Sequence, residues 1–189
     1  MKISAVIFDL DGVIVSTDEY HYQAWKHISD QENIYFDREI NERLRGVSRM
    51  ESLDIILSRS NRSYSDNEKQ LLAQRKNEIY CELLNNLSPT NILPGVLNLL
   101  LSLKARDVKV AIGSSSKNTP FILKQIGLTS NFNAVADGNS IKNSKTDPEV
   151  FLLAAEKLRV TPAECAVIED AEAGIDAAKA AGMKAVGPD

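Results

Sequence analysis

Residues 3–12 read ISAVIFDLDG, and this short stretch decides the fold. From Ile3 to Phe8 it is mostly apolar and rich in β-branched side chains, a pattern typical of a buried strand in a parallel sheet. Gly12 ends the strand. Asp9 and Asp11 therefore stand at its carboxyl end, where ligands bind in open α/β sheets.

The chain after Pro89 alternates strand and helix patterns. Strands are expected at 108–112, 133–136, 165–168 and 183–186, and helices at 96–105, 120–126, 148–158 and 171–181. Such alternation forms right-handed βαβ units. We therefore expect an α/β fold with a doubly wound parallel sheet. Because such sheets usually continue into a covering helix, we also expect that the C-terminus is either cut short or naturally minimal.

Residues 17–88 follow a different pattern. They are polar, contain one glycine (Gly46) and no proline, and space their apolar residues as helices do. The longest helix is expected from Asp66 to about Leu87, with Leu71, Leu72, Ile79, Leu83 and Leu84 on one side. We therefore expect a core domain at 1–16 and 89–189 and an inserted helical cap domain at 17–88, with hinges near 14–17 and 88–93.

Composition and charge disfavour several classes of partner. The net charge of the 189-residue chain is −4, which disfavours nucleic acids and anionic membranes as partners. The apolar N-terminal stretch is too short for a signal peptide, and no apolar run could span a bilayer. Cys81 and Cys165 form no paired motif, which suits a reducing compartment. We expect a cytoplasmic monomer acting on a small phosphorylated molecule.

Polar side chains gather where the expected strands end. Two acidic pairs, a hydroxyl-rich run and two lysines fall at this one edge of the sheet: Asp9, Asp11, Ser114, Ser115, Ser116, Lys117, Asn118, Lys145, Glu169 and Asp170. The carboxylates would repel one another, and Mg²⁺, which prefers oxygen ligands, would resolve the repulsion. Taken singly, each acid could equally be a turn or helix-cap residue.

The run from Gly113 to Asn118 leads from a strand into a helix. Hydroxyls and backbone N–H groups in such a place favour a phosphate, and Lys145 would add a positive charge. In isolation, the serine run could be a solvated loop and Lys145 a surface lysine.

Four stretches resemble the motifs of the haloacid dehalogenase superfamily: FDLDGVI, GSSSKN, SKTDPEVF and VIEDAEAGIDAAKAAGM. STDEYHYQAW at 16–25, LRGVSRMESL, the RKN at 75–77 and GSSSKN are similar to the β-phosphoglucomutase family of that superfamily, and LRGVSR and GSSSKN are the discriminating stretches. The resemblance covers essentially the whole chain.

The resemblance implies a role for each matching residue. Asp9 would be the nucleophile and Asp11 the general acid and base. One Mg²⁺ would be held by Asp9, the carbonyl of Asp11, Glu169 and Asp170. Ser114 and Lys145 would bind the transferring phosphoryl group. Substrate binding would fall to Thr17, His21, Arg45, Gly46, Val47, Arg49, Ser52, Lys76, Ser115, Ser116, Lys117 and Asn118.

The implied reaction interconverts β-D-glucose 1-phosphate and glucose 6-phosphate through glucose 1,6-bisphosphate. Two alternatives stay open: a magnesium-dependent sugar phosphatase, and a phosphosugar-binding module without catalysis. The sequence departs from the family pattern at Thr146, where proline is frequent, and at Arg45, where lysine is frequent.

Overall fold

A five-stranded sheet forms the core of one part of the chain in the computed structural model, which describes residues 2–45 and 47–187. Every strand pairing is parallel, and the strand order is β3-β2-β1-β4-β5. The strands are β1 (Ala5–Phe8), β2 (Lys109–Gly113), β3 (Ala134–Ala136), β4 (Cys165–Ile168) and β5 (Lys184–Val186). This order is that of a doubly wound α/β fold, so the expected fold class is confirmed.

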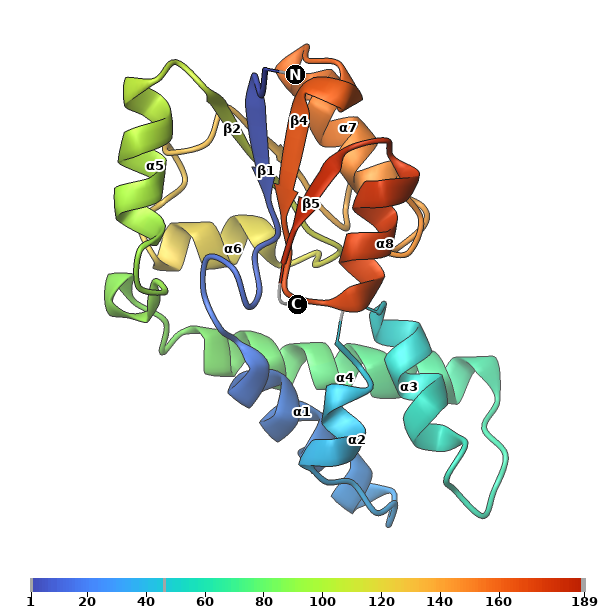
Figure 1. Cartoon of the computed structure of the whole chain (residues 1–189). Coiled ribbons are helices and arrows are strands. Elements are labelled where there is room, and N and C mark those ends of the chain that lie inside the picture. The colour runs from blue at the N-terminus through green and yellow to red at the C-terminus, as the bar shows by residue number, and fades with distance from the viewer. Residues whose placement is uncertain (1, 46, 188–189) are drawn as a thin grey trace. The chain divides into compact units, whose positions relative to one another are not determined.

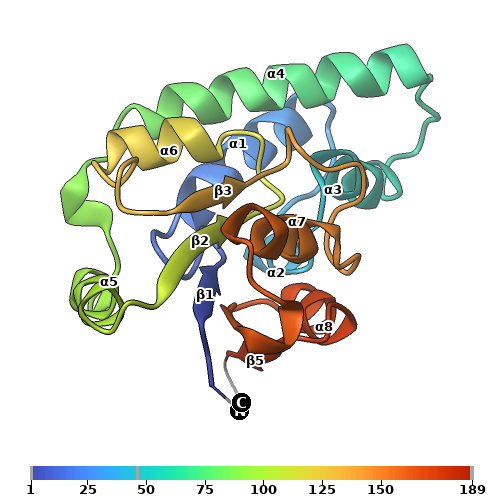
Figure 2. The ribbon, with the colours of Figure 1, turned by 90° about the horizontal axis from the view of Figure 1, so that it is seen from above.

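Helices cover both faces of this sheet. Those that follow β1 in the sheet-forming part of the chain are α5 (Val96–Ala105), α6 (Thr119–Gln125), α7 (Glu149–Leu158) and α8 (Glu172–Ala180), with 3-10 turns at Pro89–Asn91 and Pro162–Glu164. Figures 1 and 2 show α5 and α6 on one side of the strands and α7 and α8 on the other. The predicted helix 96–105 and strand 165–168 have the predicted bounds, and the other predicted elements of this part differ only at their ends.

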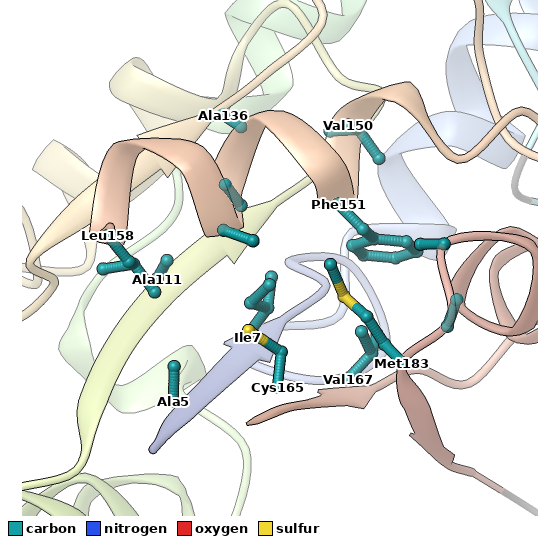
Figure 3. Close-up of a cluster of buried hydrophobic side chains, with 14 of the residues drawn as sticks. Ala5, Ile7, Ala111, Ala136, Val150, Phe151, Leu158, Cys165, Val167 and Met183 are labelled. Carbon is teal, nitrogen blue, oxygen red and sulfur yellow. The ribbon is translucent and has the colours of Figure 1, made fainter. Parts of the chain in front are cut away.

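The core beneath α7 and α8 is built from alternate residues of the strands. Side chains at successive strand positions point to opposite faces, so Ala5 and Ile7 of β1 face the same helices. Figure 3 shows these residues packed with Val167 of β4 and with Phe151 of α7. All four side chains are at most 1% exposed. This close packing holds the strand ends rigidly, and with them the residues that directly follow each strand.

Residues from Thr17 to Asn86 form a separate helical bundle. Its helices are α1 (Asp18–Gln31), α2 (Arg38–Glu42), α3 (Arg49–Leu57) and α4 (Asp66–Leu84). Capping boxes start α3 at Ser48 and α4 at Ser65, because each serine side chain and a glutamate three residues later satisfy backbone N–H groups that a helix start leaves open. The core contains Trp25, Ile28, Leu53 and Ile56, among others.

The predicted apolar side of α4 is partly wrong. Leu71 was expected on the buried side with Leu72, but its side chain is 66% exposed, whereas Leu72 is buried. The buried stripe consists of Leu72, Ala73, Lys76, Tyr80 and Leu84. Lys76 and Tyr80 occupy two of the buried positions. The spacing of apolar residues alone therefore does not predict which side of α4 is buried.

By its internal contacts the chain divides into two compact units. One comprises Met1–Ser16 with Leu87–Asp189, and the other comprises Thr17–Asn86. None of the helices in the described part of the chain combines the length and apolar character that crossing a bilayer requires.

Candidate active site

The carboxyl ends of β1 and β4 bring acidic residues together. Phe8 lies beside Ile168 in the sheet register, and the N–H of Asp9 donates to the carbonyl of Ile168 at 2.9 Å. The next residues of the two strands, Asp9 and Glu169, therefore emerge side by side. Asp9, Glu169 and Asp170 each offer one carboxylate oxygen within 4.8 Å of the others.

Lys145 lies between two of these acids although it follows Asp9 by 136 positions. Its ammonium donates to Oδ1 of Asp9 and, at 2.7 Å, to Oε2 of Glu169. The Phe151 ring, whose centroid is 4.9 Å from Nζ, covers the same group. Burial would lower the pKa of Lys145, but the Asp9 and Glu169 carboxylates outweigh it and raise that pKa above its usual value. Lys145 is therefore a charged ammonium at neutral pH.

Both oxygens of Glu169 have partners. Oε1 accepts from the backbone N–H groups of Asp170 at 3.2 Å and Ala171 at 3.1 Å, while Oε2 accepts from Lys145. Burial and the nearby Asp9 carboxylate raise the pKa of Glu169 to about 7, although Lys145 opposes that shift. These hydrogen bonds hold the Glu169 carboxylate in one orientation. Burial and the neighbouring Asp9 carboxylate disfavour its negative charge.

This arrangement fits a magnesium ion. The donors are all carboxylate oxygens, which Mg²⁺ prefers. Ligands on opposite sides of Mg²⁺ lie about 4.2 Å apart, twice the usual Mg–O distance, which is close to the observed spread of at most 4.8 Å. The Lys145 ammonium between Asp9 and Glu169 shows that the place already accommodates a cation. Asp9, Glu169 and Asp170 are the side chains that would hold it.

Asp11 lies in the turn that follows β1. It is half-buried and forms an isolated bridge with Val15, while the N–H of Gly12 donates to the Val15 carbonyl at 2.8 Å. The turn holds Asp11 two residues beyond Asp9, at the same edge of the sheet.

The hydroxyl-rich loop after β2 lies against the lysine. Ser114 is buried, and its N–H donates to the Ala136 carbonyl of β3 at 3.1 Å. Ser115 Oγ accepts from the N–H of Lys145 at 3.4 Å, which joins this loop to the acidic cluster. The predicted Ser114, Ser115 and Lys145 are therefore brought to one place. Ser116 and Asn118 are half-buried further along the loop, and Lys117 is exposed.

A turn that sequence reasoning missed supports this loop. Asn139 Nδ2 donates to the carbonyl of Lys117 at 2.9 Å, and the N–H of Gly138 donates to that of Ser116 at 3.2 Å. Asp137 in turn accepts from the N–H of Asn139 at 3.0 Å. Polar residues directly after the strand 133–136 were the available signal, because they had to lie at the same edge as the serines.

The helical unit has its own buried polar cluster. Lys76 is 2% exposed and lies 2.7 Å from Nδ1 of His21. Tyr80 packs its ring 4.1 Å from that of His21 and places its hydroxyl 2.8 Å from Oγ1 of Thr17. Burial, followed by the charges of Lys76 and Arg49, holds the pKa of His21 well below its usual value. His21 is therefore neutral, and the structure joins the three predicted residues Thr17, His21 and Lys76.

Tyr80 is the second group that sequence reasoning missed. Its ring centroid is 4.4 Å from Lys76 Nζ, and that of Trp25 is 4.9 Å away. Tyr80 falls four residues after Lys76 on α4, so helical spacing would have placed the two on one side.

The other predicted residues of this unit lie around the start of α3. Arg45 pairs with Asp18 at 3.1 Å, Val47 is half-buried, and Arg49 is the first residue of α3. Burial lowers the pKa of Arg49. Ser52 is 3% exposed. The predicted Gly46 lies outside the described residues.

Fold and site together define a class of protein: a doubly wound α/β protein with acidic side chains and a buried lysine gathered at the carboxyl end of its sheet. Residues 3–182 match the haloacid dehalogenase-like hydrolase family. The chain belongs to this family, as its motifs predicted.

Individual relatives are similar over nearly the whole chain. The β-phosphoglucomutase of Bacillus subtilis is 51% identical over 98% of this chain and 83% of its own. A crystal structure of a Clostridium difficile β-phosphoglucomutase superposes with a TM-score of 0.93 at 44% identity, covering 98% of this chain and 84% of that one. A phosphorylated carbohydrates phosphatase of Thermotoga maritima is 30% identical over 97% of this chain and 84% of its own.

Proposed function

We propose that this protein is a β-phosphoglucomutase, which interconverts β-D-glucose 1-phosphate and D-glucose 6-phosphate. Phosphoryl transfer is supported by one observation above all: Asp9 contacts Lys145 at an edge where Glu169 and Asp170 offer further oxygens. The choice of sugar is supported by the 51% identity with the Bacillus subtilis mutase.

Asp9 acts as the nucleophile in this proposal. One of its carboxylate oxygens carries the phosphoryl group as an aspartyl phosphate. The hydroxyl at C6 of glucose 1-phosphate attacks the phosphorus, the bond from phosphorus to the Asp9 oxygen breaks, and Asp11 accepts the hydroxyl proton. The product is β-glucose 1,6-bisphosphate. After it turns over, Asp9 takes the phosphoryl group from C1, Asp11 returns the proton, and glucose 6-phosphate leaves.

The neighbours of Asp9 stabilise the negative charge of the transferring phosphoryl group. The Lys145 ammonium neutralises the transferring group, and the Ser114 hydroxyl donates to one of its oxygens. A Mg²⁺ ion held by Asp9, Glu169 and Asp170 would neutralise further charge on the phosphoryl oxygens. Within the sheet-forming unit, the other phosphate of the sugar binds Ser116, Lys117 and Asn118. Thr17, His21, Arg49 and Lys76 of the helical unit are assigned to substrate binding. These assignments follow from the family resemblance.

A coupled assay tests the function. Purified protein receives β-glucose 1-phosphate, MgCl₂ and a trace of glucose 1,6-bisphosphate, and glucose 6-phosphate is followed through its dehydrogenase. We expect turnover that EDTA abolishes. Asp9→Asn, which keeps the shape but not the nucleophile, should lose at least about 10³-fold in kcat. Glucose 6-phosphate no higher than in a protein-free blank would contradict the proposal.

A sugar phosphatase is the second candidate, favoured by the 30% identity with the Thermotoga maritima phosphatase. The two activities differ in the acceptor, which is a sugar hydroxyl in the mutase and water in the phosphatase. Inorganic phosphate and glucose 6-phosphate should therefore be measured in the same reaction. Phosphate released faster than the isomer forms would favour the phosphatase.

A further inference from the structure

Two glycines lie directly against the acidic residues of the candidate metal site. A Cβ built on Gly174 of α8 would lie 2.0 Å from Oε2 and 2.1 Å from Cδ of Glu169. A Cβ built on Gly12 would lie 2.1 Å from Oδ2 of Asp170. Both distances are far below 3.0 Å, a limit that real Cβ atoms essentially always respect. Any side chain at either position must therefore displace a carboxylate.

The Glu169 carboxylate cannot move aside without losing partners. Its Oε1 accepts from two backbone N–H groups, its Oε2 accepts from Lys145, and the residue is 2% exposed. A shift of either oxygen would leave a buried charged group without a hydrogen bond, which is costly. The position of this carboxylate thus depends on the absence of a side chain at 174.

We propose that Gly174 and Gly12 are positioning residues for the metal site. They leave the space in which the carboxylates of Glu169 and Asp170 turn toward Asp9. This inference rests on the proposed function, because it concerns the magnesium ligands named there. The new element is that Gly12 and Gly174, which carry no side chain, determine whether the carboxylates of Glu169 and Asp170 can converge on one ion.

The backbone at Gly174 makes the effect of substitution diagnostic. Gly174 is buried inside α8, and its φ is not positive. Because alanine is a better helix former than glycine, helix propensity alone predicts that Gly174→Ala stabilises the protein. The positioning role predicts weaker Mg²⁺ binding whatever happens to helix stability, so the two effects can be separated.

Gly12 requires a control for backbone strain. Its φ is +84°, a conformation that alanine adopts only with strain. Gly95 has a φ of +88°, and a Cβ built there meets nothing within 4 Å. Gly95→Ala therefore carries similar strain without moving a carboxylate, and the difference between the two variants isolates the contact with Asp170.

Calorimetric titration of MgCl₂ into the metal-free full chain tests the proposal. We expect Gly174→Ala and Gly12→Ala to bind Mg²⁺ at least about tenfold more weakly than wild type, a loss of about 1.4 kcal/mol. Gly95→Ala should stay within about twofold of wild type. The rise in thermal midpoint on adding MgCl₂ gives a second readout and should shrink in the same two variants.

Wild-type affinity in both Gly174→Ala and Gly12→Ala would overturn the proposal, as would a wild type that does not bind Mg²⁺. If Gly174→Ala does not fold, the comparison of Gly12→Ala with Gly95→Ala decides. The readout is binding, so it is independent of the reaction. A wild type that binds Mg²⁺ but makes no glucose 6-phosphate would contradict the proposed function alone.

Discussion

Lys145 shows how a single residue organises the candidate site. Its charge is buried, and the carboxylates of Asp9 and Glu169 keep it ionised. The dependence is mutual, because the same ammonium compensates two acids that would otherwise face each other in a buried place. A buried ion pair adds little net stability when complete, but removing one partner leaves an uncompensated charge.

Replacing Lys145 by methionine should therefore destabilise the metal-free protein strongly. At pH 8 the expected loss is about 3–5 kcal/mol in the free energy of unfolding, because both carboxylates lose their counter-ion. MgCl₂ should restore part of this loss. Urea denaturation followed by circular dichroism, with EDTA or with MgCl₂, measures both effects. The exposed Lys117→Met is the matched control, and equal losses in the two variants would be inconsistent with this account.

At the scale of elements, the loop after β2 depends on the turn after β3. The two strands are adjacent in the sheet, and Ala136 of β3 accepts from Ser114. The turn that follows then supports the loop through Gly138 and Asn139, which contact the carbonyls of Ser116 and Lys117. Ser116 and Lys117, which are proposed to bind a phosphate, are thus held in place by the turn after β3, which is not itself proposed to contact the phosphate.

Asn139→Ala should weaken substrate binding more than catalysis. The variant loses the hydrogen bond to Lys117, which contributes about 0.5–1.5 kcal/mol. The KM for β-glucose 1-phosphate should therefore rise about 2- to 12-fold, with kcat within about twofold because Asp9 and Lys145 are untouched. Steady-state kinetics measures both. The control is Asn98→Ala, on the exposed surface of α5, which should change neither KM nor kcat. For Asn139→Ala, a fall in kcat at unchanged KM would argue against a binding role.

At the scale of the whole molecule, two units each enclose their own hydrophobic core. The single tryptophan, Trp25, is buried in the helical unit, so its fluorescence reports on that unit. The same unit encloses neutral His21 between Lys76, Tyr80 and the nearby Arg49. An unfolded chain would let this histidine take up a proton at its usual pKa of about 6.5.

Acid should therefore weaken the helical unit. Below about pH 6.5 the unfolded state binds a proton at His21 that the folded state does not, so stability falls as pH falls, by up to about 1.4 kcal/mol per pH unit. The loss should therefore grow steadily between pH 6.5 and pH 5.0. His21→Asn should flatten this dependence and the exposed His27→Asn should keep it, as measured by urea denaturation with Trp25 fluorescence. A slope unaltered in His21→Asn would disprove the explanation.

The sequence by itself determined the sheet, the order of its elements and the acids at its edge. Local patterns sufficed for this, because a buried strand such as 5–8 is apolar throughout and the residues that follow it must lie at its carboxyl end. The sequence alone thus assigns Asp9, Glu169 and Asp170 to one edge of the sheet. The family followed from the same motifs.

Only the tertiary structure decided which side chains touch. The contact of Lys145 with Asp9 spans 136 positions. The approach of the Glu169 carboxylate to the place where a Cβ at Gly174 would lie depends on the rotation of α8 against the sheet. The exposure of Leu71 and the burial of Lys76 likewise depend on how α4 packs. Spacing along a chain predicts which edge or side a residue occupies, whereas contacts depend on packing between distant segments, which no local pattern records.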